Sequence, residues 1–415
     1  MTLKRVVVTG LGALTPIGNT LREYWDGLKA GKSGAAPITR FDATLFKTKF
    51  ACELKNFDIG NFMDRKEARK MDPFAQYAMV VADEAIKDSN LPLSELDPNR
   101  AGVIWGSGIG GLLTFQEEVK SFAKGDGTPR FNPFFIPKMI PDLSAGHISI
   151  KYGFRGPNFV TVSACASSTN AIYDAFTYIR LGKADVIVSG GSEAAVCEAG
   201  VGGFNAMKAL SERNDSPETA SRPYDKDRDG FVLGEGAGAL ILEEYEHAKK
   251  RGAKIYAEVI GGGLSADAYH ITAPHPEGAG ITKVMDNALE DAGIKPEVVD
   301  YVNTHGTSTP LGDIGEIRAI EKVFGEHVYS MNISSTKSMT GHLLGAAGAI
   351  EAIACLMAIV EGVVPPTINN HTRDEGLSER LNLTLNKAQQ RQVNIAISNT
   401  FGFGGHNASI VLKKV

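Results

Sequence analysis

Cys165 is the residue whose type and setting in this sequence most favour chemistry. The apolar segment 158–162 precedes it, and residues 168–180 repeat apolar side chains at helical spacing, so Cys165 should lie at a strand-to-helix turn. The partial positive charge at a helix N-terminus stabilises a thiolate. We therefore predict that Cys165 is a nucleophile with a lowered pKa. The other cysteines are predicted to be structural: Cys52, Cys197 and Cys355.

Two of the nine histidines stand in comparable settings. His305 follows the apolar segment 301–304, and His342 follows residues 337–341, ahead of a helix rich in glycine and alanine. Because open α/β sheets bind ligands at the carboxyl ends of their strands, Cys165 and both histidines could converge on one site. A cysteine hydrolase would need one histidine with an orienting Asn or Asp, whereas a pair of histidines suits a developing oxyanion or enolate.

The elements that must position these residues alternate between short β-branched runs and helical patterns, which predicts an α/β fold. The same order of strand and turn occurs twice, as at 103–108 and 301–306. This repetition predicts two duplicated halves, residues 1–252 and 253–415. The predicted strands are 5–9, 101–105, 158–162, 185–189, 254–260, 300–304, 332–335 and 394–398, and the predicted helices include 72–88, 168–180, 281–291 and 343–360.

Residues 125–142 form the least regular part of the sequence. Their prolines predict neither a regular helix nor a central strand. Their aromatic side chains should need cover from the core or from a partner subunit. The residues concerned are Pro129, Pro133, Pro137 and Pro141, with Phe131, Phe134 and Phe135.

Composition excludes several classes of protein. The 43 Lys and Arg residues are outnumbered by 48 Asp and Glu, and the net charge of -5 argues against a general nucleic-acid binder. Four scattered cysteines form neither a disulfide framework nor a zinc pattern. The apolar stretch 346–360 contains Glu351 and falls short of the ~20 residues that a membrane span needs. We expect a cytoplasmic protein without a membrane span.

Three motifs imitate cofactor or metal sites and fail on spacing. The glycine turn 106–111 has no acidic residue at the end of the next strand, as dinucleotide binding requires. Segment 27–33 has three residues between its glycines, where a phosphate loop needs four. Segment 225–230 begins like a calcium loop, but Gly236 stands where the bidentate Glu belongs. We predict no cofactor and no metal.

Four motifs together resemble the β-ketoacyl-acyl-carrier-protein synthases, in matching order from Arg5 to Leu412. Ile109 and the segment 267–272 resemble most closely the synthase II type, which elongates long chains. His406 departs from the Thr that many synthases II carry. The motifs are the Cys165 segment 161–170, His305-Gly306-Thr307-Ser308-Thr309, Lys337-Ser338-Met339-Thr340-Gly341-His342 and Phe401-Gly402-Phe403-Gly404-Gly405.

The resemblance implies a thiolase fold, in which two duplicated halves pack as five α-β-α-β-α layers, and a homodimer that needs no organic cofactor. Cys165 would hold the acyl chain as a thioester, and the N–H groups of Cys165 and Phe403 would form the oxyanion hole. His305 and His342 would assist the decarboxylation of malonyl-carrier protein and stabilise the enolate that attacks the thioester. The expected partner is therefore acyl carrier protein, in its acyl-loaded and malonyl-loaded forms.

The resemblance also assigns residues around the reacting groups. Thr307 and Thr309 would contact the pantetheine arm. Ile109 would line the inner acyl pocket near Phe204, and Phe403 would be a mobile gate. The remaining assignments are Thr272 to substrate binding, Phe135 to closing the pocket from the other subunit, Lys337 to the local charge network and Glu351 to the support of Lys337.

A basic cluster at residues 65–70 is the candidate surface for docking the carrier protein. On a helix, three of its basic residues would share one face through i,i+3 and i,i+4 spacing. Carrier proteins of this family are acidic, so a basic face on an acidic enzyme fits them; an ordinary solvated face is the alternative. The cluster consists of Arg65, Lys66, Arg69 and Lys70, of which the last three share the face, and Lys208 and Arg130 are weaker candidates.

Three alternatives stay open at the level of the sequence. The first is a condensing enzyme with synthase I specificity, or one from a specialised pathway. A thioester hydrolase would use Cys165 and His305 and release a free acid. An inactive partner that only shapes another subunit's pocket is disfavoured, because Cys165, His305 and His342 are all present.

Overall fold

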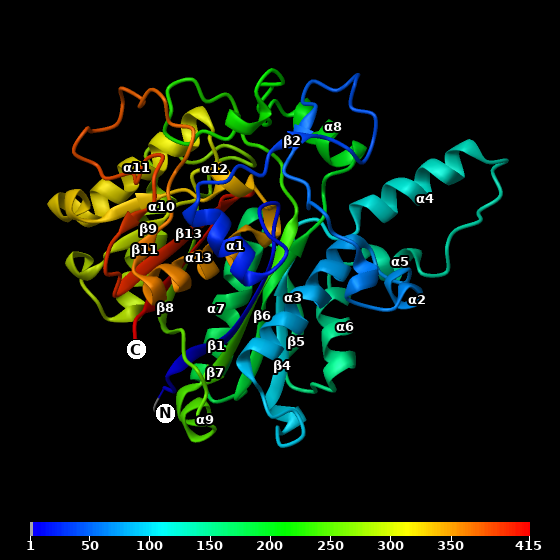
Figure 1. Cartoon of the computed structure of the whole chain (residues 1–415), viewed down its shortest axis with the longest axis horizontal. Helices are drawn as coiled ribbons and strands as arrows, with labels where there is room; N and C mark the ends of the chain where they lie inside the picture. Colours follow the sequence, from blue (N-terminus) through cyan, green and yellow to red (C-terminus); the bar gives the residue numbers. More distant parts are fainter. Residues whose placement is uncertain (1–2) are drawn as a thin grey trace.

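The computed structural model describes residues 3–415 and is built around one large mixed sheet (Figure 1). Within these residues ten strands join in the order β10-β9-β13-β14-β8-β1-β7-β6-β4-β5, and β1 pairs with β8 over only three residue pairs. The large sheet consists of β1 (Val6–Leu14), β4 (Ala101–Gly106), β5 (Asn158–Thr161), β6 (Val186–Glu193), β7 (Gly236–Glu244), β8 (Ala257–Ala266), β9 (Tyr301–Asn303), β10 (Asn332–Ser334), β13 (Ile395–Gly402) and β14 (His406–Lys413).

The pairing is the same on both sides of the β1–β8 junction. In each group of five strands, the three farthest from the junction run parallel and the two nearest to it pair antiparallel. Two small antiparallel sheets stand apart. They are β2 (Ala36–Pro37) with β3 (Phe50–Ala51), and β11 (Val363–Val364) with β12 (Gln389–Gln390).

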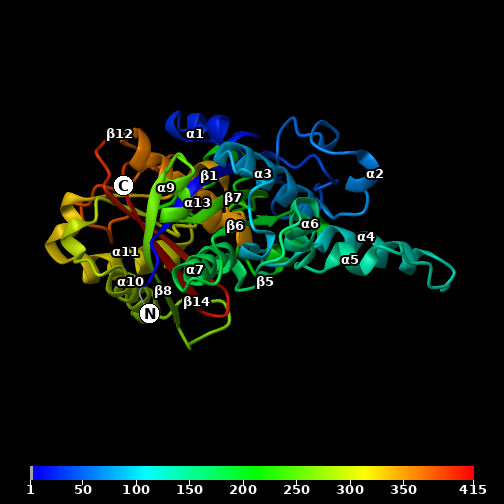
Figure 2. The same ribbon diagram turned by 90° about the horizontal axis from the view of Figure 1, so that it is seen from below.

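Two helices lie between the two groups of strands. Both α7 (Ser167–Arg180) and α13 (Ala347–Glu361) contact strands of the group from β1 to β5, including β6 and β7. Both also contact strands of the group from β10 to β8, including β14. Helices α3 (Pro73–Ser89) and α6 (Leu143–Tyr152) cover one outer side, and α10 (Ala279–Ala292) and α11 (Pro310–Phe324) lie on the other (Figure 2). The predicted five α-β-α-β-α layers are confirmed.

The remaining helices surround this core. They are α1 (Leu21–Lys29), α2 (Arg65–Ala68), α4 (Leu112–Lys124), α5 (Phe135–Met139), α8 (Glu198–Ala206), α9 (Tyr245–Lys250) and α12 (Lys337–Thr340).

The central position of α13 explains its composition. A helix surrounded on all sides must be apolar all round, and residues 347–359 are all buried. The segment Leu344–Glu361 has a mean hydropathy of 1.8 and could cross a membrane by length and composition. However, 89% of it is buried inside the fold, as expected of a core helix.

The predicted elements are found, but β1, β6, β8 and β13 extend four to six residues beyond their predicted ends, and the ends of α3 follow the capping rules. Asp72 caps α3 by accepting the N–H of Phe74 at 3.2 Å, Pro73 occupies the first helical position, and Asn90 ends the helix in the left-handed conformation. The strand predicted at 254–260 instead begins at Ala257 and continues to Ala266.

Strands β7 and β14 were not predicted. Both are central strands, β7 between β1 and β6 and β14 between β13 and β8. Strand β7 begins with Gly236-Ala237-Gly238-Ala239, residue types that are uncommon in strands, and all nine of its residues are buried, so no polar alternation marks it.

The prediction of no regular helix in residues 125–142 is wrong for α5. This helix contains Pro137 at its third position, where the backbone N–H would have no intrahelical acceptor and its loss is tolerated. Helices α4 and α5 form an arm that projects from the core (Figure 1). Along this arm Phe131 lies 5.4 Å from Phe122 and 5.4 Å from Phe135 between ring centroids.

Candidate active site

Cys165 lies in a single 3₁₀ turn, Ala164–Ala166, between the end of β5 and the start of α7. The turn is held by Ser167, whose hydroxyl donates to the Ala164 carbonyl (2.7 Å) and accepts the Ser163 N–H (2.9 Å). Strand β4 approaches this turn closely at Gly106, where an added Cβ would lie 2.5 Å from the Ser168 nitrogen. Glycine at this position therefore allows the sheet to support the turn directly.

The two histidines meet Cys165 from the second half of the chain. His342 Nε2 lies 3.0 Å from Cys165 Sγ, and the ring of His305 stands perpendicular to that of His342 with centroids 5.2 Å apart. The backbone of His342 is fixed by Val232, whose carbonyl accepts its N–H at 2.8 Å. The three side chains therefore share one site, as the strand-end argument anticipated.

The predicted lowering of the Cys165 pKa is wrong in sign. Burial raises the pKa of the thiol to about 12, and this effect exceeds the opposing influence of the Lys337 charge and of a hydrogen bond from the Phe403 backbone. The sequence shows that the cysteine starts a helix, but it does not show that the site is closed to water. Cys165 is consequently a thiol at neutral pH and needs a base when it reacts.

Burial also governs the histidines. It lowers the pKa of His305 and of His342 well below the ordinary histidine value, and the charge of Lys337 lowers both further. Lys337 is 1% exposed and forms a short ion pair with Glu351, which is fully buried. Burial raises the pKa of Glu351 to about 7 and Lys337 opposes that rise. At neutral pH the site thus presents two neutral imidazoles, and the Lys337–Glu351 pair is buried beside them.

Most of the predicted substrate residues line one cavity of about 590 Å³ around Cys165. Lys337 does not line it and lies buried behind the histidines. Phe135 does not line it either, because α5 places it in the projecting arm. The predicted residues that do line the cavity are Cys165, His305, His342, Phe403, Thr307, Thr309, Ile109, Phe204, Thr272 and Lys208.

Two buried carboxylates that the sequence analysis missed organise this cavity. Glu316 accepts the N–H groups of His305 (2.9 Å) and Gly306 (2.8 Å), which fixes the loop of the first histidine. Glu193 accepts the N–H groups of Ile109 (3.1 Å) and Gly345 (3.0 Å), so it joins the glycine turn to the segment after His342. Acidic residues inside an apolar strand or helix are the only sequence signal for either.

Phe231 is a further missed residue. Its ring packs edge-on against His342 with centroids 5.4 Å apart, and against Phe204 at 5.3 Å. It therefore connects the imidazole to the apolar part of the cavity and helps to exclude water from the site.

The basic cluster at 65–70 departs from its predicted geometry. Helix α2 ends at Ala68, so Lys70 lies beyond it and pairs with Glu67 at 2.7 Å. The next helix needs Asp72 as its cap, which leaves no room for α2 to continue. Lys66 and Arg69 are exposed and make no ion pair within residues 3–415, whereas Arg65 pairs with Asp58 (2.8 Å) and Arg130 with Asp126 (3.2 Å).

Comparison with known proteins defines the class first. Residues 3–248 match the family model "Beta-ketoacyl synthase, N-terminal domain", and residues 256–371 match "Beta-ketoacyl synthase, C-terminal domain". The chain belongs to the β-ketoacyl synthase family.

Individual relatives show which members of this family the chain resembles. A protein from Synechocystis sp. named 3-oxoacyl-[acyl-carrier-protein] synthase 2 is 51% identical over 411 residues, which cover 99% of this chain and 98% of the relative. A crystal structure of a β-ketoacyl synthase from Burkholderia phymatum matches with a TM-score of 0.92 and 34% identity, covering 99% of this chain and 100% of that one. A ketosynthase of a type II polyketide synthase, solved with its acyl-carrier protein, matches with a TM-score of 0.90 and 35% identity over the whole of both chains.

The raised pKa of Cys165 predicts an unusual pH dependence of alkylation. The thiolate is the reactive form, so the rate constant with iodoacetamide should rise about tenfold per pH unit from about pH 7 to about pH 10. Peptide mass mapping separates Cys165 from the other cysteines. A rate that levels off near the ordinary thiol pKa of about 8.5 would contradict the effect of burial.

Proposed function

We propose that this protein catalyses the decarboxylative Claisen condensation of malonyl-acyl-carrier protein with an acyl chain held on Cys165. The product is a 3-oxoacyl-acyl-carrier protein two carbons longer, in fatty acid biosynthesis. The observation that carries the proposal is the buried contact of Cys165 with His342 beside His305. Whole-length identity to relatives named 3-oxoacyl-[acyl-carrier-protein] synthase 2 supports it.

In the first half-reaction Cys165 Sγ attacks the carbonyl carbon of the acyl thioester. His342 Nε2, 3.0 Å from the sulfur, accepts the thiol proton and returns it to the departing pantetheine sulfur. The carbonyl oxygen becomes negative in the transition state, and the N–H groups of Cys165 and Phe403 are proposed to stabilise it. The acyl chain is then bound to Cys165 as a thioester.

In the second half-reaction the malonyl group loses CO₂, and the electron pair of the broken bond forms an enolate. Neutral imidazoles can each donate one hydrogen bond, so His305 and His342 are proposed to stabilise the enolate oxygen. His342, whose Nε2 accepts the thiol proton in the first half-reaction, acts here as the tautomer that carries its proton on Nε2. The enolate carbon forms the new bond to the acyl carbonyl carbon, the bond from that carbon to the Cys165 sulfur breaks, and the departing sulfur takes up a proton from water to become a thiol again. Lys337, with Glu351 as its counter-ion, is proposed to hold the charge network around these steps.

The cavity divides between the two parts of the substrate. Thr307 and Thr309, whose hydroxyl oxygens lie 3.2 Å apart, are proposed to bind the pantetheine arm, with Thr272 nearby. Ile109 and Phe204 are proposed to line the acyl chain, and Phe403 to gate access to Cys165.

A homodimer is part of the proposal. The projecting arm exposes large apolar side chains, with Phe115 45%, Phe134 43% and Ile136 54% exposed, and the edge strand β5 lies at the end of the large sheet. A second copy of the chain would cover this surface and bring Phe135 to the partner's acyl pocket. We also propose that the chain divides into halves at residues 252 and 253, on the repeated strand pairing, and that the protein is cytoplasmic.

Acyl carrier protein is the proposed macromolecular partner. Lys66 and Arg69 are exposed and unpaired among the described residues, and Lys208 is exposed while lining the cavity. These three are the strongest docking candidates, while Arg65, Lys70 and Arg130 already have carboxylate partners. The contribution of Arg65, Lys70 and Arg130 to docking should therefore be smaller.

Intact-mass spectrometry tests the division of labour in the site. Incubation with an acyl-carrier protein should add one acyl mass to Cys165, and malonyl-carrier protein should then remove it as a product two carbons longer. Cys165→Ala should abolish the adduct, while the control Cys52→Ala should retain it. His305→Ala should slow condensation by at least ~10²-fold and slow acyl transfer less, because its hydrogen bond serves the enolate.

If His305→Ala slowed acyl transfer and condensation equally, the role assigned to His305 in stabilising the enolate would be contradicted. Release of a free acid in place of the longer product would instead identify a thioester hydrolase.

Reversing the charge of Lys66 and Arg69 together, as Lys66→Glu/Arg69→Glu, tests the docking surface. The KM for malonyl-carrier protein should rise roughly 3- to 30-fold, because two attractive contacts become repulsive. The penalty should shrink as salt screens the charges. The KM for malonyl-pantetheine, which lacks the carrier, should stay unchanged.

The matched control is Lys249→Glu/Lys250→Glu on α9, which contacts β1 and lies away from α2 (Figure 1). A defect shared by both substrates, or by the control variant, would refute this docking surface.

A further inference from the structure

The loop that carries Thr307 and Thr309 is supported from the side opposite the cavity. The Asp313 carboxylate accepts the N–H groups of Ser308 (3.0 Å) and Thr309 (3.3 Å). Ser308 has a φ of +70°, a left-handed conformation that a non-glycine residue adopts at a cost and that the surroundings must hold in place. The two threonine side chains therefore depend on groups that never reach the cavity.

Arg228 is the second support of this loop. Its Nε donates to the Thr309 carbonyl at 3.0 Å, and its Nη2 donates to the Pro310 carbonyl at 2.7 Å. Its side chain is only 2% exposed, and Nε lies 3.5 Å from the fully buried Asp313 carboxylate. The rigid, planar guanidinium holds its donors on three separate nitrogens, whereas a lysine has a single nitrogen and cannot reproduce all of these contacts.

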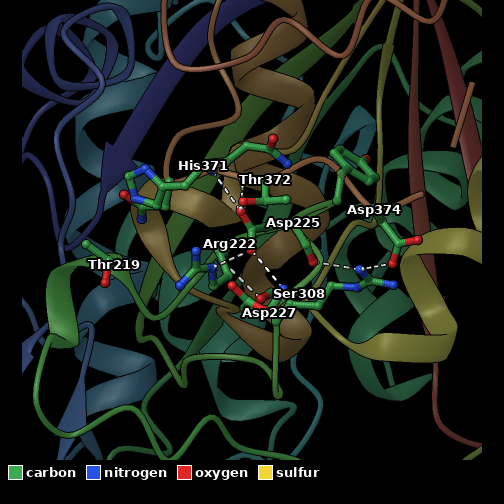
Figure 3. Close-up of polar contacts among 12 residues, drawn as sticks. Thr219, Arg222, Asp225, Asp227, Ser308, His371, Thr372 and Asp374 are labelled. Carbon is green, nitrogen blue, oxygen red and sulfur yellow. Dashed lines mark hydrogen bonds and ion pairs between the residues drawn. The ribbon is translucent and has the colours of Figure 1, made fainter. Parts of the chain in front are cut away.

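Arg228 is itself held in place by two further hydrogen bonds. Its Nη1 donates to the Asp225 carbonyl at 2.7 Å and to Asp374 Oδ2 at 2.6 Å. The Asp225 carboxylate accepts the backbone N–H groups of His371 (2.7 Å) and Thr372 (2.9 Å) (Figure 3). The segment that contains Asp225 and Arg228 is therefore joined to the segment that contains His371 and Asp374. The motif that resembles a calcium loop in the sequence therefore acts as an internal brace.

We propose that Arg228 is a positioning residue for the pantetheine arm. By holding the carbonyls of Thr309 and Pro310, it directs the Thr307 and Thr309 hydroxyls toward the cavity, where they bind the arm. The inference rests on the proposed function, in which both threonines contact the arm. It adds a residue that does not touch the substrate, and whose loss should weaken binding of the arm without impairing the chemistry at Cys165.

Arg228→Lys tests this inference, because it keeps a positive charge beside Asp313 but has one nitrogen in place of the three that hold Thr309, Pro310, Asp225 and Asp374. Two donors are compared for acylation of Cys165: hexanoyl-pantetheine, which has the arm, and p-nitrophenyl hexanoate, which lacks it. The concentration of hexanoyl-pantetheine that gives half the maximal rate should rise about 10- to 100-fold, with a maximal rate within about twofold of wild type. The rate constant with p-nitrophenyl hexanoate should also stay within about twofold.

Arg373→Lys is the matched control. Arg373 also donates to two backbone carbonyls, those of Ser378 (2.7 Å) and Leu381 (3.1 Å), in a neighbouring segment. It makes no hydrogen bond to the loop that carries Thr307 and Thr309 within residues 3–415. Neither donor should be affected by this variant.

A double-mutant cycle separates positioning from general stabilisation. In the background Thr307→Val/Thr309→Val, adding Arg228→Lys should raise the half-saturating concentration of hexanoyl-pantetheine no further, because the hydroxyls that Arg228 positions are gone. Full additivity in this background, or equal losses with both acyl donors, would overturn the proposal.

Asp374→Ala keeps the test decisive if Arg228→Lys fails to fold, because alanine has no side-chain oxygen to accept the Arg228 Nη1–H. It removes one anchor of Arg228 at a position where the Asp374 side chain is 20% exposed, and it should give the same arm-specific defect at smaller size. An unchanged half-saturating concentration would overturn the proposal. Wild-type protein that accepts hexanoyl from p-nitrophenyl hexanoate and none from hexanoyl-pantetheine would instead overturn the proposed function.

Discussion

The burial of Cys165 and His342, with His305 only partly exposed, is the constraint on which the rest of this site depends. Burial disfavours charged forms, so it keeps the sulfur protonated and both imidazoles neutral at neutral pH. Lys337 is buried with them and forms an ion pair with Glu351. Charge then develops during the reaction itself, in surroundings where fixed hydrogen-bond donors act far more strongly than they would in water.

The five-layer fold produces this closure by placing α7 and α13 back to back in its centre. Each of these helices begins after a 3₁₀ turn, Ala164–Ala166 and Leu344–Ala346, and each turn starts with a residue of left-handed φ. The position that corresponds to Cys165 in the second turn is Gly345, which Glu193 binds through its N–H. One turn therefore supplies the nucleophile, while the other supports the segment that presents His342.

Sequence patterns identified the elements whose signals are local and the residues whose chemistry is distinctive. Cys165, His305 and His342 were found because each follows a strand that the apolar pattern predicts. The direction of the Cys165 pKa shift was predicted wrongly, because a helix start can be read from the sequence and desolvation by distant segments cannot. Strand β7 was missed for a related reason, since a strand buried on both faces shows no alternation.

Long-range polar contacts were the other gap. Glu193 and Glu316 accept backbone N–H groups between 10 and 152 residues away, and Arg228 donates to carbonyls 81 and 82 residues away. Nothing near these residues in the sequence indicates those partners. Pro137 led to an error of the opposite kind, since no helix was predicted where α5 forms. Proline is excluded from a helix interior but tolerated in its first turn.

The most direct test of the central claim is an NMR titration of the histidine side chains in ¹⁵N-labelled protein from about pH 9 to about pH 5. The resonances of His305 and His342 are assigned from the variants that lack each ring. We predict that both rings keep the neutral pattern across this range, because burial and Lys337 oppose their protonation. Protonation of either ring with a midpoint near the ordinary value of about 6.5 would contradict the account.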